Sequence, residues 1–162
     1  SIDFNLKIEG DVSGLDTMVP QFDLAIIIGD LAENAFIAIK HLKKEQTFHK
    51  TLFSIGNTKN GYEISVSDSG IPFTIDTLIN LGVERVTTHQ EDGGSGYGYE
   101  TIFEFIHEYG ASLIITEYEP ETNIYSKNIA IRFDGNTDYM IQSFRTDTIK
   151  KVNSNTKLIL VN

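Results

Sequence analysis

The sequence contains no cysteine among its 162 residues. This absence excludes disulfide bonds, thiolate nucleophiles and cysteine-ligated zinc sites. It also suits a protein of the reducing cytosol. The chemistry of any site in this chain must therefore come from other side chains.

Basic residues are scarce, because 13 Lys and Arg stand against 23 Asp and Glu and give a formal net charge of −10. A surface that binds duplex nucleic acid needs clustered Lys and Arg, so we expect no nucleic-acid partner. The charge does not exclude a nucleotide. An acidic protein can hold polyphosphate through Mg²⁺ and backbone N–H groups.

The sequence also lacks a signal-peptide pattern and any apolar run long enough to span a bilayer. It begins directly in a strand-like stretch, residues 2–9, which we interpret as the start of a domain cut from a longer chain. The length suits one domain, or one domain with a small appendage.

Local patterns predict strands and helices of ordinary length. Alternating apolar and polar residues at 2–9 indicate a half-buried strand. Further strands are expected at residues 51–57, 62–68, 112–118 and 123–133, with weaker candidates at 138–144 and 157–161. Helices are expected at residues 22–44, 75–81 and 99–109. Asn60-Gly61 favours a tight hairpin, and Gly110 closes a helix.

These elements predict an α+β fold. We expect a two-layer α/β sandwich, in which a mixed, mainly antiparallel sheet carries helices on one face. We assign residues 1–133 to this domain. Residues 134–162 are expected to form a C-terminal extension packed on the same domain.

The helix expected at residues 22–44 carries two polar residues in an apolar surround. Asp30 and Asn34 lie four residues apart and share one face. They indicate a pocket, although two exposed residues on an amphipathic helix would give the same pattern. An amide oxygen suits Mg²⁺, and a carboxylate one turn earlier can orient or deprotonate a water. A separate apolar stripe comprises Ile28, Leu31, Ala35, Ile39 and Leu42.

A second polar motif, Asp68-Ser69-Gly70, ends the strand expected at residues 62–68. A buried carboxylate at this place can accept a hydrogen bond from an exocyclic amine, and Gly70 lets backbone and ring approach closely. The alternative is a plain Asp-Ser-Gly turn.

A glycine-rich stretch, Gly94-Ser95-Gly96-Tyr97-Gly98, leads into the helix expected at residues 99–109. Closely spaced glycines let N–H groups converge on phosphate, and the helix N-terminus adds partial positive charge. No Walker loop is present, because no Gly-Lys-Ser/Thr follows. The surrounding loop, residues 82–98, is long and polar, which is typical of a lid.

The order of these motifs resembles the GHKL superfamily of ATP-binding domains, which have the Bergerat-type fold. This superfamily contains gyrase, heat-shock chaperone, histidine kinase and mismatch-repair ATPases. The resemblance spans residues 2–133. Within the superfamily, the chain looks most like the catalytic ATP-binding domain of sensor histidine kinases. The run Glu33-Asn34-Ala35-Phe36-Ile37-Ala38 is similar to the quorum-sensing receptor branch.

The resemblance implies a role for each matched residue. Asn34 matches the asparagine that ligates Mg²⁺, and Asp30 matches a preceding polar position that is the general base in the ATPase members. Asp68 matches the aspartate that reads the adenine amine, and Gly70 is the glycine beside it. Ser126 lies near the late Thr/Ser position of the family. The second glycine box, which holds the phosphates under the lid, matches Gly94, Gly96, Tyr97 and Gly98.

Two positions depart from the family pattern. Pro72 stands where the first glycine box normally has another glycine, which stiffens the entry to the lid. Ile37 stands where many histidine kinases carry Lys or Arg, so this phosphate contact is missing. Lys40 and Arg85 are the candidates to replace it, and both are equally consistent with plain surface charges.

The resemblance implies a histidine kinase domain that binds ATP and Mg²⁺ under a flexible lid. It would donate the γ-phosphoryl group to a histidine on an adjoining dimerisation segment outside this chain. The implied partners are that segment, a response regulator and a second copy in a full-length homodimer. The implied location is cytoplasmic, and the whole protein is a candidate membrane-anchored receptor. Two alternatives stay open: a nucleotide-gated interaction switch without phosphotransfer, and a GHKL-type ATP hydrolase with Asp30 as base.

Overall fold

A seven-stranded sheet in the order β1-β2-β3-β5-β4-β6-β7 forms the centre of the molecule. The computed structural model describes residues 1–43, 45–46, 48–81, 98–153 and 157–161. The strands are β1 (Asp3–Glu9), β2 (Lys50–Thr58), β3 (Gly61–Asp68), β4 (Ser112–Glu117), β5 (Lys127–Arg132), β6 (Tyr139–Ser143) and β7 (Leu158–Val161). The helices are α1 (Leu15–Met18), α2 (Gln21–Lys40), α3 (Ile75–Asn80), α4 (Gly98–Tyr109) and α5 (Thr146–Val152).

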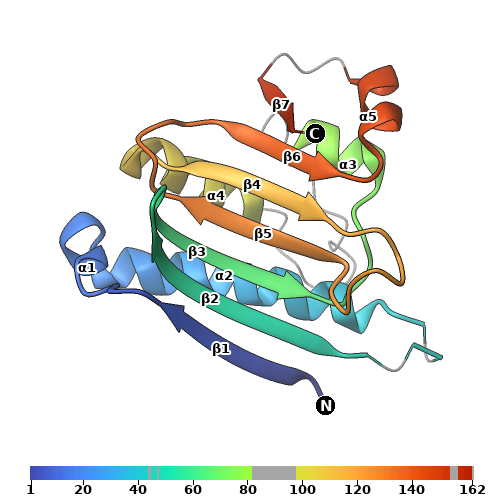
Figure 1. Ribbon diagram of the computed structural model, residues 1–162, viewed down its shortest axis with the longest axis horizontal. Helices are drawn as coiled ribbons and strands as arrows, with labels where there is room; N and C mark the ends of the chain where they lie inside the picture. Colours follow the sequence, from blue (N-terminus) through green and yellow to red (C-terminus); the bar gives the residue numbers. More distant parts are fainter. Residues whose placement is uncertain (44, 47, 82–97, 154–156, 162) are drawn as a thin grey trace.

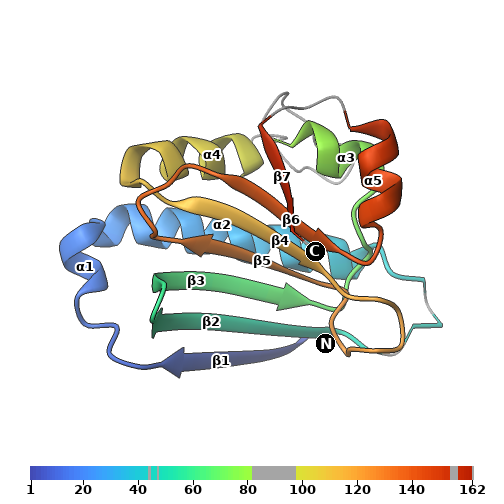
Figure 2. The same ribbon diagram turned by 45° about the horizontal axis from the view of Figure 1, so that its top comes forward.

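Two layers are visible in Figures 1 and 2, where α2 and α4 lie side by side over one face of the sheet. The long helix forms because its apolar residues recur every three or four positions and can be buried together. Its buried residues are Ile27, Leu31, Ala35, Ala38 and Ile39. The expected α+β sandwich is confirmed. Within the described residues, no helix is both long and apolar enough to cross a bilayer.

Pairing in the sheet changes from the centre to the edges. The central strands β2, β3, β5 and β4 pair antiparallel, while β1 pairs parallel with β2, and β6 pairs parallel with both β4 and β7. The hairpin predicted at Asn60-Gly61 is confirmed, because Thr58 pairs with Gly61. Gly61 takes a φ of 103°, which favours glycine.

The C-terminal residues continue the same sheet. The two weak strand candidates are both strands, β6 and β7, and the unpredicted helix α5 connects them. Ile149 of α5 is fully buried in the core. The division of the chain at residue 133 stays a prediction.

Strand register places matching side chains in rows on the helix side of the sheet. One row is apolar and contains Phe53, Val66, Ile129 and Ile115. The row at the end of β3 is polar instead and contains Thr51, Asp68, Lys127, Glu117 and Ser143. Polar groups inside a core need partners, so this row marks the place where the site is built.

β1 is a strand, but the expectation that it is half-buried is wrong. All its residues are exposed, and the side chains of Phe4, Leu6 and Ile8 are 52%, 60% and 59% exposed. The reason is its position at the outer edge, because α2 packs over β3 and β2.

The helix expected at residues 22–44 is shorter than predicted, because α2 ends at Lys40. Its last turn tightens, since the N–H of Leu42 donates to the carbonyl of Ile39 at 3.0 Å.

Candidate functional site

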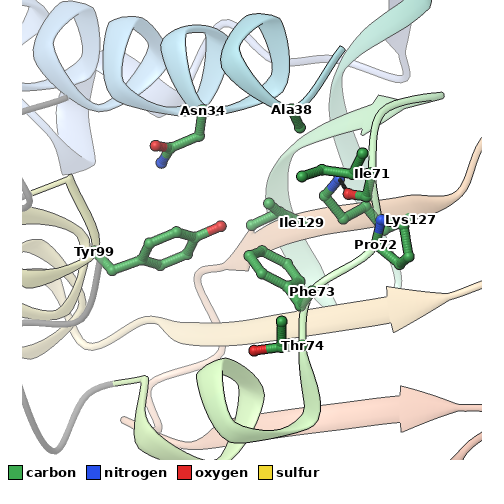
Figure 3. Close-up of a pocket in the computed structure, with 9 residues that line it drawn as sticks. All are labelled: Asn34, Ala38, Ile71, Pro72, Phe73, Thr74, Tyr99, Lys127 and Ile129. Carbon is green, nitrogen blue, oxygen red and sulfur yellow. Dashed lines mark hydrogen bonds between the residues drawn. The ribbon is translucent and has the colours of Figure 1, made fainter. Parts of the chain in front are cut away.

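A cavity of about 90 Å³ lies between α2, the segment after β3, α4 and β5 (Figure 3). Its lining residues are Asn34, Ala38, Ile71, Pro72, Phe73, Thr74, Tyr99, Lys127 and Ile129. The rings of Phe73 and Tyr99 meet edge to face with centroids 5.9 Å apart. Most ligand pockets measure about 300–1,000 Å³, so this cavity has room for only a small group.

Asn34 points into this cavity from α2, toward Tyr99 (Figure 3). Its Nδ2 atom is buried and has no hydrogen-bond partner among the described residues. Asp30, one turn earlier, is half-buried and does not line the cavity. Burial raises the pKa of Asp30, and the nearby charge of Glu33 raises it further. The two residues are therefore neighbours on α2, and only Asn34 contributes to the cavity.

Asp68 and Lys127 form an ion pair in the interior. Lys127 Nζ lies 2.8 Å from Asp68 Oδ1, and the two side chains are 3% and 0% exposed respectively. Lys127 also donates to the carbonyl of Ile71 at 2.7 Å, and the N–H of Gly70 donates to Asp68 Oδ1 at 2.8 Å. Burial raises the pKa of Asp68, and this effect outweighs the opposing attraction of Lys127. Asp68 Oδ2 is buried without a partner in the described part of the chain.

Gly70 brings the segment after β3 against the backbone of α2. A Cβ atom at Gly70 would lie 2.5 Å from the carbonyl carbon of Ala38 and 2.6 Å from its Cβ. The N–H of Ile71 donates to the carbonyl of Ala38 at 3.1 Å. Only glycine permits this approach, and the approach makes residues 71–74 a wall of the cavity.

A second buried ion pair holds the same wall from the other side. Arg145 Nη2 donates to Glu117 Oε2 at 2.6 Å and to the carbonyl of Phe73 at 2.7 Å. The Glu117 side chain is fully buried and also accepts from Ser143 Oγ at 2.8 Å. The position of Phe73 is therefore set by residues of β4, β6 and the start of α5.

Tyr99 supplies the side of the cavity that belongs to α4. Its hydroxyl is buried without a partner among the described residues, and burial raises its pKa well above the ordinary value. Gly98 is the first residue of α4, one residue before the helix start expected at Tyr99. Gly94, Gly96 and Tyr97 lie outside the described residues.

No protein-family model matches this chain, and no curated protein matches it. Several solved structures do match this chain in fold. The catalytic domain of the histidine kinase ThkA, in a nucleotide-free form, superposes with a TM-score of 0.58 at 15% identity, over 80% of this chain and 76% of that chain. The chain has the fold of a histidine kinase catalytic domain. The mycobacterial sensor histidine kinase MprB agrees with a TM-score of 0.50 at 16% identity, over 80% of this chain and 79% of that chain.

Within this histidine kinase fold, the residues predicted from the sequence take different places. Asn34 lines the cavity, while Asp68 lies behind Lys127 and contacts it. Ser126 lines a separate groove of about 460 Å³, and its N–H donates to the carbonyl of Asp68 at 2.8 Å. The cavity is thus built around one of the two predicted residues of α2.

Lys127, Phe73 and Tyr99 are absent from the residues predicted from the sequence. A signal for Lys127 exists, because it alternates with Ile129 and Ile131 and so shares the inward face of an apolar strand. A charge at such a position needs a buried partner. No comparable signal marks Phe73 or Tyr99.

The amide and carboxylate oxygens of α2 suit a Mg²⁺ ion that also takes ligands from water and phosphate. They are too few for a metal site formed by protein ligands alone. No group of three or more His, Asp or Glu in the described ranges could hold a metal ion. Asn34 and Asp30 supply an amide and a carboxylate one turn apart. Mg²⁺ usually takes one or two protein ligands together with water and phosphate oxygens, which this donor set allows.

Proposed function

We propose that this chain is the ATP-binding catalytic domain of a sensor histidine kinase. One observation carries the proposal: Asn34 Nδ2, Asp68 Oδ2 and Tyr99 Oη are buried without partners among the described residues, in or directly beside one cavity of this fold. Buried polar atoms are nearly always hydrogen-bonded. Leaving one unsatisfied costs about 1–3 kcal/mol, so a polar ligand that pairs with them would bind favourably.

Asp68 and Lys127 together suit the recognition of adenine. Lys127 occupies Oδ1 of Asp68, and Oδ2 is left to accept a hydrogen bond from the exocyclic amine. Phe73 and Tyr99 offer aromatic faces to a base. Because the cavity measures only about 90 Å³, it would have to widen to admit the base.

The phosphates would extend from the adenine site along α2 toward the glycine-rich stretch. The N–H groups of Gly94, Gly96, Tyr97 and Gly98 would bind phosphate oxygens. Asn34 would hold Mg²⁺, with Asp30 accepting a hydrogen bond from a water beside it. When bound, Mg²⁺ neutralises the charge of the phosphates around the transferred group.

The proposed reaction transfers the γ-phosphoryl group to a histidine outside this chain. A histidine nitrogen attacks the γ-phosphorus, the bond to the β–γ bridging oxygen breaks, and ADP leaves. The acceptor histidine would lie on a separate dimerisation segment. A response regulator would then receive the phosphoryl group, and the whole protein would act as a homodimer with this domain in the cytoplasm.

The two alternatives share the nucleotide site and differ in the step after ATP binds. An ATP hydrolase would use Asp30 as the base toward the attacking water, so its steady-state release of phosphate would be abolished by Asp30→Asn. A nucleotide-gated switch would bind ATP and transfer nothing.

Incubation of the full-length protein with γ-labelled ATP separates these functions. The proposal predicts label in an acid-labile, base-stable phosphohistidine, and no label in the Asn34→Ala variant. The matched control is Asn136→Ala, which removes an exposed asparagine and should label normally. Phosphate release without phosphohistidine would contradict the kinase and favour the hydrolase.

A further inference from the structure

The outer strand β1 presents an open backbone edge. It pairs with β2 alone among the described strands, and no described element lies beyond it in Figures 1 and 2. The N–H of Asp3 donates to the carbonyl of His49 at 2.7 Å, so the backbone of Asp3 faces the β2 side. Backbone direction alternates along a strand that pairs parallel. The N–H and C=O groups of Phe4, Leu6 and Ile8 therefore face outward, and an unpaired edge of this kind can template another strand.

An exposed apolar stripe runs along the same strand. Phe4, Leu6 and Ile8 share the helix side of the sheet, because Leu6 is in register with Phe53 and Ile8 with Ile55. The Phe4 ring lies 6.1 Å from the buried Phe53 ring, yet all three stripe residues are more than half exposed. Natural edge strands are usually short, covered or interrupted by proline. β1 spans seven residues and contains no proline.

Charge selects one register for a second copy of β1. Antiparallel pairing must join outward-facing residues of both strands. If Phe4 lies opposite Leu6 of the second copy, Asp3 falls opposite Lys7, and apolar residues meet only apolar residues on the helix side. The next register, with Leu6 opposite Leu6, places Asp3 opposite Glu9. The register after that places Lys7 opposite Lys7. Like charges directly opposite each other are unfavourable, so the first register is preferred among the three that pair at least five residues of each β1.

The existing ion pairs of β1 fit that register. Lys50 Nζ lies 3.3 Å from Asp3 Oδ2, and Lys7 Nζ lies 3.2 Å from Glu9 Oε2. Pairing brings Asp3 of one copy to Lys7 of the other, so Lys50, Asp3, Lys7 and Glu9 alternate in sign across the junction. A lone edge lysine normally protects against pairing. In this register Lys7 lies opposite the carboxylate of Asp3 in the second copy. Charge pairs of this kind determine register and choice of partner more than they add affinity.

We infer that two copies of this domain associate directly through β1, antiparallel and in the register that places Asp3 opposite Lys7. The contact is two-fold symmetric, which closes the assembly at a dimer. It joins two seven-stranded sheets into one and covers the stripe of Phe4, Leu6 and Ile8. β1 lies two strands away from β3, so the contact is independent of the proposed nucleotide site.

The mass of this chain in solution, measured by sedimentation equilibrium over a range of concentrations, tests the contact. We expect the mass to rise from 18.1 kDa toward twice that value with concentration. Leu6→Lys should stay at 18.1 kDa. The matched control is Ile159→Lys, an exposed apolar residue on the opposite outer strand β7, and it should associate like the parent.

A charge exchange tests the register. Asp3→Lys alone and Lys7→Asp alone should each abolish association, because each places like charges opposite one another. An equimolar mixture of the two variants should restore it, because each pair then has opposite signs. Recovery in the mixture also shows that both variants are folded. A mass of 18.1 kDa at every concentration of the parent, or a mixture no better than its components, would overturn the inference.

Discussion

Lys127 Nζ and Asp68 Oδ1 lie 2.8 Å apart, with both side chains removed from solvent. Asp68 is the residue that the family resemblance implies as the reader of the adenine amine, and in the structure its cationic partner comes from β5. The pair leaves one carboxylate oxygen without a partner in the described residues. This pair therefore bears both on the stability of the fold and on the proposed binding of adenine, and each can be tested separately.

Replacing Lys127 should lower the free energy of unfolding. Lys127→Met leaves Asp68 buried without its counter-charge, and breaking one side of a buried pair costs about 3–5 kcal/mol. Urea unfolding measures the loss. The control is the double variant Asp68→Asn with Lys127→Met, which should recover much of the stability because no charge remains buried. A single variant within about 1 kcal/mol of the parent would show that the pair is not needed.

Stability should respond to pH through Asp68. Its pKa is raised above 3.8 in the folded state, so the folded protein holds the proton more tightly than the unfolded chain. Its contribution is therefore greatest below pH 3.8 and is lost as pH rises through the folded-state pKa. We expect Asp68→Asn to gain stability relative to the parent as pH rises through this window. Urea midpoints of both proteins at a series of pH values check the sign. If the stability of Asp68→Asn relative to the parent increased as the pH fell, the prediction would be contradicted.

Two glycines of the same region should respond oppositely to alanine. Gly70→Ala places a Cβ 2.5 Å from the backbone of α2, and such overpacking costs about 1–3 kcal/mol. Gly29→Ala is the matched control, because its added Cβ would have no described atom within 4 Å apart from its chain neighbours and the backbone of its own helix. There, alanine in a helix should stabilise by about 0.5–1 kcal/mol. Thermal unfolding of both variants decides, and equal effects would refute the close approach at Gly70.

The ion pairs Arg145–Glu117 and Arg132–Glu63 should contribute differently to the free energy of unfolding. Arg145→Met leaves the fully buried Glu117 unpaired and frees the Phe73 carbonyl, so we expect a loss of about 3–5 kcal/mol. Arg132→Met is its control, because that arginine pairs with the partly exposed Glu63 at 2.9 Å. Partly exposed pairs contribute about 0–1 kcal/mol. Urea unfolding compares the two, and similar losses would show that burial of Glu117 does not matter.

Much of the fold is encoded in local patterns of the sequence. The periodicity of the residues in α2 and the Asn60-Gly61 turn each specify their element without help from distant residues. For β1, the predicted strand is correct and the predicted half-burial is wrong. Its alternation is real, but exposure depends on how far α2 reaches across the sheet, which is a tertiary property.

The site could be predicted only in part. Asn34 is predictable because a polar residue interrupts an apolar helix face. The partner of Lys127 is not predictable, because Asp68 lies 59 residues away and meets Lys127 only through strand pairing. Likewise, Arg145 reaches Glu117 and Phe73 only after β6 has joined β4. The roles of Gly94, Gly96 and Tyr97 stay predictions.

The most direct test of the proposed function is thermal unfolding of this chain with and without Mg²⁺-ATP, for the parent and for Asp68→Asn. Ligand at a hundredfold excess over its Kd should stabilise the parent by about 2.7 kcal/mol. The gain should be lost in Asp68→Asn, because the amide offers the adenine amine a weaker acceptor, and kept in the exposed control Asn136→Ala. A shift in the parent that vanishes with Asp68→Asn is the predicted result. No shift at saturating ATP, or an equal shift in Asp68→Asn, would contradict an adenine site at Asp68.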